Sequence, residues 1–264
     1  MKLKSKLLII AGSDSSGGAG IQADIKTATS LGVYAMTAIT AITAQNTTGV
    51  KSIVPVPPKE IFNQISFSVQ DIKPNSVKIG MLHNVGVIKE VIKAIKKHKL
   101  KNIVIDPVMV AKGGHRLISN SSINYLRKKL LPYALLVTPN IPEAETLIKK
   151  RIQTLEDVIK AGKEILKFGP KFVLIKGGHT NKSYIEDVLI SKNNIKIFKN
   201  KKIKTKNTHG TGCTLSSAIA SFISKNYGMN ESCRRSIQYV HKAILLNPKF
   251  GRGHGPINHM ALLN

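Results

Sequence analysis

Short apolar runs alternate along this chain with longer segments in which apolar residues recur at helical spacing. A short continuous apolar run is typical of a strand buried on both faces of a parallel sheet. The predicted strands are Leu7–Ala11, Tyr34–Ala44, Val50–Val56, Val77–Met81, Asn102–Met109, Leu135–Asn140 and Phe172–His179. Helices are predicted from Ile21 onward and over 59–69, 85–98, 119–131, 154–168, 211–227 and 231–246. The alternation predicts an α/β protein with a central, mostly parallel sheet.

The segment between the last parallel strand and the final helices has a different pattern. Asp187–Ile190, Ile195–Phe198 and Ile203 predict short antiparallel strands at one edge of the sheet. Neither an internal repeat nor a linker rich in Pro, Gly or Ser interrupts the chain, so we expect a single domain over 1–264. Cys233 falls in the last predicted helix, and we expect it in the packing between the two final helices.

Composition narrows the class of protein. A chain of 264 residues with 42% hydrophobic content can bury one core. The apolar run near the start, Leu7–Ala11, is too short for a signal peptide, and no stretch reaches the eighteen apolar residues of a membrane span. The two cysteines give neither a disulfide framework nor metal-ligand spacing. We therefore expect a cytoplasmic protein that does not enter a membrane.

The charge is strongly positive, with 41 Lys+Arg against 14 Asp+Glu. Such an excess is typical of proteins that bind nucleic acid, which is one alternative for this chain. The lysines, however, are scattered through every segment, and aromatic residues that could stack on bases are few. We expect no nucleic-acid partner, although a positive field would attract an anionic substrate such as ATP.

The most informative stretch is Asn207–Thr214, which precedes the first of the two final helices. Its glycines, Gly210 and Gly212, allow a tight turn, so that backbone N–H groups and the positive end of the helix converge on an anion hole. Cys213 falls in the first helical turn, where the dipole should lower the pKa of its thiol. The alternative is a plain helix cap with a buried cysteine.

Other polar residues follow predicted strands, at the sheet edge where α/β proteins bind ligands. Gly12–Gly20 is a glycine-rich loop after the first strand, but its spacing is not that of a Walker A loop. Gln45 offers a donor and an acceptor to a ring, or bonds within a turn. Asp106 could hold the water shell of Mg²⁺, or cap the following segment. Asn140 and Glu143 have the spacing of a helix cap.

These stretches carry a resemblance to a known family. Ala11–Asp24 reads Ala-Gly-Ser-Asp-Ser-Ser-Gly-Gly-Ala-Gly-Ile-Gln-Ala-Asp, and Asn207–Thr214 reads Asn-Thr-His-Gly-Thr-Gly-Cys-Thr. With the motifs at 106–109, 140–143 and 176–179, they resemble the hydroxymethylpyrimidine/phosphomethylpyrimidine kinases of the ribokinase-like superfamily. The resemblance implies a three-layer sandwich. It also implies that ATP and Mg²⁺ are used to phosphorylate 4-amino-5-hydroxymethyl-2-methylpyrimidine to its monophosphate and then its diphosphate, for thiamine biosynthesis.

The resemblance also assigns roles. It implies that the substrate is bound by Gly12, Asp24, Gln45, Met81 and Val108. It implies that ATP is bound by Lys176, Thr208 and Thr211, and that Mg²⁺ is placed by Asp106 and Glu143. In the catalytic group, Gly210 and Gly212 hold the developing charge and Cys213 assists removal of the hydroxyl proton. For Met81, filling the core is the alternative to a wall of the site. We expect a homodimer.

Two positions depart from the family pattern, and a third distinguishes the family from most of its superfamily. Ser15 stands where the family often has Pro, and Gly113 stands where it commonly has Ser. Most ribokinase-like kinases have Asp where this chain has Cys213, so the cysteine points to the pyrimidine kinase branch. The nearest alternative within the fold is a pyridoxal or pyridoxine kinase, whose substrate also carries a hydroxymethyl group on a ring.

Overall fold

A computed structural model of the chain describes residues 4–111, 114, 116–178 and 183–262. Its centre is an eight-stranded sheet in which the strands follow the order β10-β9-β8-β7-β6-β5-β1-β2. In chain order these strands are β1 (Lys6–Ala11), β2 (Tyr34–Ile39), β5 (Ser76–Ile79), β6 (Ile103–Ile105), β7 (Leu136–Val137), β8 (Phe172–Ile175), β9 (Tyr184–Ser191) and β10 (Ile195–Lys201). Neighbouring strands pair in parallel among β2, β1, β5, β6, β7 and β8. In contrast, β9 is antiparallel to β8, and β10 is antiparallel to β9. The predicted mostly parallel sheet with an antiparallel edge is confirmed.

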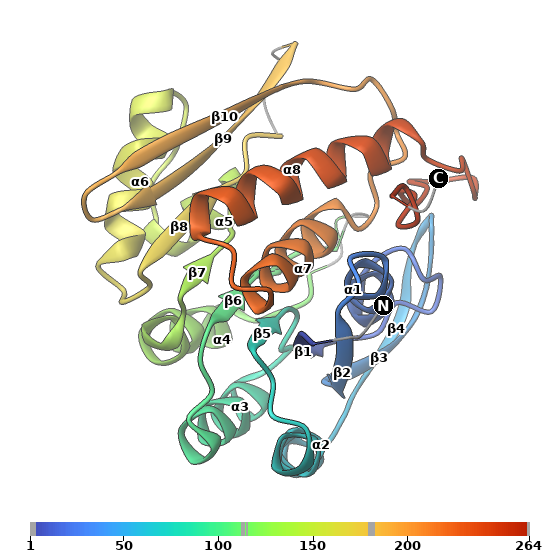
Figure 1. The fold of residues 1–264 in the computed structure, drawn as a ribbon, viewed down its shortest axis with the longest axis vertical. Helices are drawn as coiled ribbons and strands as arrows, with labels where there is room; N and C mark the ends of the chain where they lie inside the picture. The colour runs from blue at the N-terminus through green and yellow to red at the C-terminus, as the bar shows by residue number, and fades with distance from the viewer. Residues whose placement is uncertain (1–3, 112–113, 115, 179–182, 263–264) are drawn as a thin grey trace.

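Helices cover both faces of this sheet, as Figure 1 shows. One face is covered by α1 (Gly20–Ser30), α7 (Thr211–Ser224) and α8 (Met229–Leu245). The other face is covered by α2 (Pro58–Asp71), α3 (Val85–His98), α4 (Asn120–Tyr125), α5 (Ile141–Ile148) and α6 (Leu155–Leu166). Side chains of β1 alternate between the two cores, with Leu7 packed under the first group of helices and Leu8 under the second. The continuous apolar run of β1 is explained by this burial on both faces.

The predicted helix over 119–131 changes its winding. After α4, the chain forms a π-helical turn over Leu126–Leu130 and a 3₁₀ turn over Leu131–Tyr133. Pro132 lacks a backbone N–H and cannot continue an α-helix, which accounts for the end of the helix at this point. Cys233 is fully buried within the packing of α7 and α8, as the sequence predicts.

Two strand predictions are wrong: Ile203 lies beyond the end of β10 at Lys201, and 34–44 does not form a single strand. The chain leaves the main sheet at Thr40 and enters a separate antiparallel hairpin of β3 (Ala41–Asn46) and β4 (Gly49–Pro55). The N–H of Thr40 donates to Ala11 O at 3.0 Å, and its hydroxyl donates to Met81 O at 2.7 Å. These buried bonds bend the chain between two halves of similar composition, so the sequence pattern gives no sign of the break.

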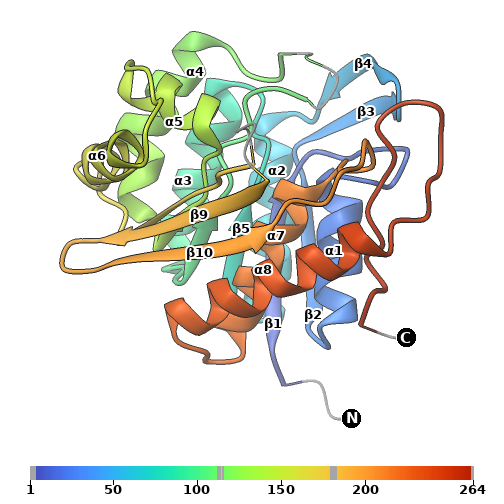
Figure 2. The same cartoon turned by 90° about the horizontal axis from the view of Figure 1, so that it is seen from above.

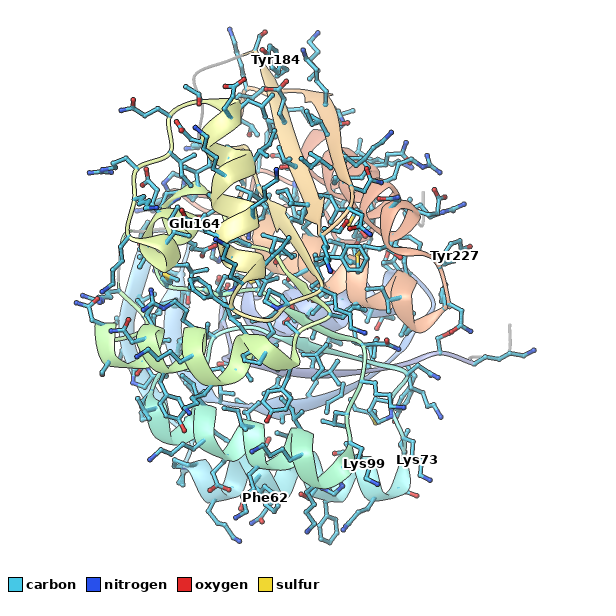
Figure 3. The ribbon with its side chains drawn as sticks, turned by 90° about the vertical axis from the view of Figure 1, so that its left-hand side faces the viewer. Phe62, Lys73, Lys99, Glu164, Tyr184 and Tyr227 are labelled. Carbon is cyan, nitrogen blue, oxygen red and sulfur yellow. The ribbon has the colours of Figure 1, made fainter. Side chains whose placement is uncertain are left out.

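Many of the lysines lie on outer surfaces. Figure 3 shows nitrogen-tipped side chains pointing outward around α2 and α3, with Lys73 and Lys99 just beyond the carboxyl ends of these helices. Three ammonium groups, those of Lys59, Lys93 and Lys97, lie 4.7–5.5 Å from the centre of the Phe62 ring. Their alkyl stems cover apolar surface while the charges stay in water. Within the described residues, no helix is long and apolar enough to cross a bilayer.

Candidate active site

A pocket of about 490 Å³ opens at the carboxyl ends of the parallel strands. It lies where the chain leaves β1, β5, β6 and β8, because residues directly after these strands border it. This is the ligand-binding edge of an open α/β sheet. The predicted site residues that border it are Gly12, Gln45, Met81, Asp106, Val108, Glu143, Lys176, Gly210, Gly212 and Cys213. One pocket therefore brings together residues that are widely separated in the sequence.

The start of α7 has the backbone geometry that the predicted anion hole requires. Gly210 precedes the helix with φ of 83°, and a Cβ there would lie 1.8 Å from Gly18 O, so both backbone angle and space require glycine. A Cβ on Gly212 would lie 3.3 Å from Lys176 Nζ and 3.6 Å from Asp106 Oδ2. The first N–H groups of a helix have no acceptor within the helix, and the N-cap residue of α7, Gly210, has no side chain that could bind them. These groups can bind a phosphate at the edge of the pocket.

Cys213 borders the pocket in the first turn of α7, but its thiol is not activated as the sequence suggested. Burial raises the pKa of Cys213 to about 12; Lys78 lowers it, while Asp24 and Asp106 raise it further. A backbone N–H from Gly20 is directed at the sulfur and favours the thiolate. The predicted lowering of the pKa is therefore wrong, because loss of hydration and two carboxylates outweigh the helix dipole.

Lys176 connects the two predicted metal-binding carboxylates. Its Nζ lies 2.8 Å from Asp106 Oδ1 and 3.9 Å from Glu143 Oε2. Burial alone would lower the pKa of Lys176, but the two carboxylates outweigh it and raise that pKa. Burial raises the pKa of Glu143 to about 7 although Lys176 works against it. In this structure the ammonium group is the cation that the two carboxylates share.

Glu143 is also part of a helix cap. The Asn140 side chain accepts the N–H of Glu143 at 2.9 Å, and the Glu143 carboxylate accepts the N–H of Asn140 at 2.8 Å. This reciprocal capping box fixes the first turn of α5 at the pocket. The capping interpretation of this spacing is confirmed, and the same bonds direct the carboxylate toward Lys176.

Asp24 does not border the pocket, which corrects its predicted contact with the substrate. It is fully buried, with Lys78 Nζ 2.6 Å from one carboxylate oxygen and Ser217 Oγ donating to the other at 2.6 Å. Lys78 is also fully buried and separates Asp24 from the pocket, which Lys78 does border. Sequence reasoning missed Lys78. A lysine within the apolar run of β5 was the available signal, because such a lysine needs a buried partner.

A second buried pair joins the glycine-rich loop to the anion-hole loop. Asp14 accepts hydrogen bonds from the Ser16 hydroxyl at 2.7 Å, the Ala19 N–H at 2.8 Å and His209 Nε2 at 2.7 Å. His209 Nε2 also lies 3.4 Å from the Gln45 side-chain nitrogen. The sequence analysis assigned no role to Asp14 or His209, although both lie within the quoted motifs. The pair and Gln45 all border the pocket, so the pair joins the two loops directly beside Gln45.

The acid sensitivity of folding should report on Asp14. Burial tends to raise the pKa of Asp14, but the hydrogen bonds and charge of His209, with Ser16 and Ala19, bring it to about 2 from 3.8. A carboxyl group whose pKa is lower in the folded than in the unfolded state stabilises the fold at pH values above its unfolded pKa. This stabilisation is lost as the pH falls through the folded-state pKa, here between about pH 4 and pH 2. The lowered pKa of Asp14 contributes about 2 kcal/mol to the free energy of unfolding at neutral pH. In urea denaturation, the difference in free energy of unfolding between wild type and Asp14→Asn should shrink by about 1 kcal/mol from pH 6 to pH 3. A difference that stays constant with pH would contradict this assignment.

The remaining predicted residues divide into two groups. Met81 is buried and packs with Ala41 and Leu117 beside the pocket, so it belongs to the core and also forms a wall. Thr211 donates its hydroxyl to Thr208 O at 3.0 Å at the start of α7, and neither residue borders the pocket. Their predicted contact with ATP stays a prediction. Gly113 and His179, quoted for their motifs, lie outside the described residues.

This fold and site define a ribokinase-like phosphotransferase. Its three layers, its antiparallel edge and its pocket at the carboxyl edge of the sheet are the features of that class. The sequence profile of the phosphomethylpyrimidine kinase family matches residues 14–258. The chain belongs to this family.

The names of individual relatives agree with this family. The hydroxymethylpyrimidine/phosphomethylpyrimidine kinase of Bacillus subtilis is 42% identical over 257 residues, which cover 97% of this chain and 95% of the relative. The thiamine biosynthesis bifunctional protein ThiED of Geobacter sulfurreducens is 43% identical over 97% of this chain, and the chain spans 52% of that longer protein.

Solved structures include two kinds of kinase. The phosphomethylpyrimidine kinase of Clostridium difficile 630 is 44% identical with a TM-score of 0.82, covering 91% of this chain and 100% of that one. The pyridoxal kinase of Bacillus subtilis, solved with ADP, is 36% identical with a TM-score of 0.91, covering 98% of both chains. Sequence identity is higher with the pyrimidine kinase, whereas the fold is shared by both.

Proposed function

We propose that this protein transfers the γ-phosphate of ATP to the hydroxymethyl group of 4-amino-5-hydroxymethyl-2-methylpyrimidine, and then phosphorylates the monophosphate to the diphosphate used for thiamine. The observation that carries this proposal is the meeting of Gln45, the anion hole and Lys176 in one pocket. The names of the relatives at 42–44% identity support the same substrate. Phosphoryl transfer depends mainly on positioning and charge neutralisation, which this pocket can supply.

Gln45 would recognise the ring. Its amide supplies a donor and an acceptor, which match the amino group and a ring nitrogen of an aminopyrimidine. The Ser15 hydroxyl holds its backbone, with Gln45 N–H donating to Ser15 Oγ at 2.8 Å. Met81 and Val108 add apolar surface on the pocket wall. The ring would lie between these groups with its hydroxymethyl oxygen toward the start of α7.

The start of α7 would act on the reacting phosphate. The N–H groups of Gly212 and Cys213 would hold the negative charge that develops during in-line attack by the hydroxymethyl oxygen. The Lys176 ammonium, which would lie 3.3 Å from a Cβ on Gly212, would neutralise charge on the same phosphate. Cys213 would assist removal of the hydroxyl proton, and its high pKa means that deprotonation of the thiol limits this step near neutral pH.

The residues of this pocket fit Mg²⁺. Magnesium prefers oxygen ligands, keeps several waters and is usually bound by one or two carboxylates together with substrate phosphates. Asp106 and Glu143 border the pocket and already share a cation, the Lys176 ammonium. Among the described residues there is no cluster of three or more metal-binding side chains, so phosphates and water would complete the shell. Bound Mg²⁺ would neutralise the phosphates of ATP.

A pyridoxal kinase activity is the second candidate. The observation that favours it is the TM-score of 0.91 with the pyridoxal kinases of Bacillus subtilis and Staphylococcus aureus. The lower identity to these enzymes, 36% and 30%, makes it the weaker candidate. Pyridoxal lacks the amino group that Gln45 would bind, so the same pocket would accept it with fewer polar contacts.

The cellular setting is part of the proposal. We place the enzyme in the cytoplasm, where ATP is present and thiols stay reduced, in keeping with the two free cysteines. We also propose a homodimer, and sedimentation equilibrium at micromolar concentration measures its mass directly.

The two phosphorylation steps can be tested separately. Purified protein with Mg-ATP should release ADP when given the hydroxymethylpyrimidine alone, and also when given its monophosphate alone. The first reaction should continue beyond one ADP per pyrimidine, toward two, as the monophosphate is consumed. ADP formation with the free pyrimidine that stops at one per substrate would remove the second step from the proposal, and no ADP with either compound would contradict the function.

A further inference from the structure

A glycine-rich segment near the end of the chain, residues 251–256, crosses between two loops of the pocket; we call it the C-terminal strap. On one side it meets Thr47, in the turn between β3 and β4. The N–H of His254 donates to Thr47 O at 2.8 Å, and the N–H of Gly253 donates to Thr47 Oγ1 at 3.2 Å. A Cβ on Gly253 would lie 2.1 Å from Thr47 O, so only glycine permits this approach. Thr47 is two residues beyond Gln45.

On its other side the strap meets the loop that precedes α7. The N–H of His209 donates to Gly255 O at 3.0 Å, directly before Gly210 of the anion hole. Lys206 Nζ donates to Arg252 O at 3.3 Å, and a Cβ on Gly255 would lie 2.4 Å from Asn207 Oδ1. In Figure 2 this segment, in red, passes beside the ends of β3 and β4 and the loop before α7.

Contacts with the rest of the fold hold both ends of the strap. Before it, Asn207 Nδ2 donates to Asn247 Oδ1 at 2.7 Å. After it, Ile257 and Ala261 are buried against Ala243 of α8, and His259 Nε2 lies 3.1 Å from Thr214 Oγ1 in α7. The strap is therefore a fixed connection between the two loops and the helices below them.

We infer that the C-terminal strap is a positioning element, which holds the turn bearing Gln45 in register with the anion hole at Gly210–Cys213. The inference rests on the proposed function, in which Gln45 binds the ring and the anion hole binds the phosphate. The neighbouring turn residues Asn46 and Thr48 are exposed, so the strap and Ser15, together with the contact between Gln45 and His209, hold this end of the hairpin. A misplacement of about 1 Å between reacting groups can cost about 10²-fold in rate.

The test uses Gly253→Ala, which inserts a methyl group where Thr47 O lies. Gly228→Ala is the matched control, because a Cβ there meets no atom within 4 Å. In Gly253→Ala we expect kcat/KM for the pyrimidine to fall about 10-fold or more, while KM for ATP changes less than about twofold. Amide hydrogen exchange over 44–50, measured without substrate, should become faster. Gly228→Ala should match wild type in both measurements.

Two results would overturn the inference: unchanged exchange over 44–50 in Gly253→Ala, or faster exchange with unchanged kcat/KM for the pyrimidine. If Gly253→Ala does not fold, Thr47→Ala removes the Oγ1 acceptor without adding atoms, and should shift both readouts in the same direction by less. If wild type does not phosphorylate the pyrimidine, the proposed function fails, and with it the part of the inference that concerns Gln45. The exchange measurement still shows whether the strap holds the hairpin.

Discussion

Replacing Lys78 by Met should lower the free energy of unfolding by about 3–5 kcal/mol, because it leaves the Asp24 carboxylate buried without its partner. Both side chains have no exposed surface, and 2.6 Å separates Lys78 Nζ from Asp24 Oδ2. Burial raises the pKa of Asp24 even with Lys78 present, so removal of the ammonium should drive the carboxyl toward its protonated form. Urea denaturation at neutral pH measures the loss.

A double variant separates charge from packing. Lys78→Met with Asp24→Asn removes both charges, and should recover a large part of the stability lost in the single variant. Lys96→Met, at an exposed position of α3, should lie within about 0.5 kcal/mol of wild type. If the double variant is as unstable as Lys78→Met alone, the loss comes from packing of the lysine stem, and the account of a charge pair is wrong.

Replacing Cys213 by Ala should lower kcat for the pyrimidine by at least about 10²-fold, the usual loss when a general base is removed. The thiol borders the pocket at the start of α7, and burial raises its pKa to about 12. Because the thiolate is then scarce at neutral pH, kcat of the wild type should rise with pH through the alkaline range. This rise should be absent in Cys213→Ala.

The other cysteine supplies the control. Cys233 is fully buried in the packing of α8 and does not border the pocket. Cys233→Ala should therefore keep kcat within about twofold of wild type while losing about 1 kcal/mol of stability. Activity of Cys213→Ala close to wild type would retire its role in proton removal and leave the anion hole as the main contribution of this loop.

The sequence was informative where a local pattern determines local structure. The apolar runs gave the parallel strands because a strand buried on both faces must be apolar throughout. Gly210 and Gly212 predicted the tight turn before α7 because this turn needs a positive φ and close backbone approach, which glycine alone allows at position 210. The Asn140 and Glu143 spacing gave the cap, since its bonds lie within four residues.

The sequence failed where long-range contacts decide. Asp24 was placed against the substrate, but its partners Lys78 and Ser217 are 54 and 193 residues away along the chain. The thiol of Cys213 was expected to be acidic from its helix position alone, whereas burial and the neighbouring carboxylates have the larger effect. The end of β2 at Ile39 depends on bonds from the next residue, Thr40, to Ala11 and Met81, which no local pattern records.

The central claim, that this pocket is a pyrimidine kinase site, is tested most directly by competition. Equal concentrations of the hydroxymethylpyrimidine and pyridoxal are offered with limiting Mg-ATP, and the phosphorylated products are resolved by charge. We predict that the pyrimidine monophosphate and diphosphate take most of the phosphate, because Gln45 gives the aminopyrimidine polar contacts that pyridoxal lacks. A predominance of pyridoxal phosphate would contradict the account: the fold and the anion hole would stand, but the substrate would be a B6 vitamer.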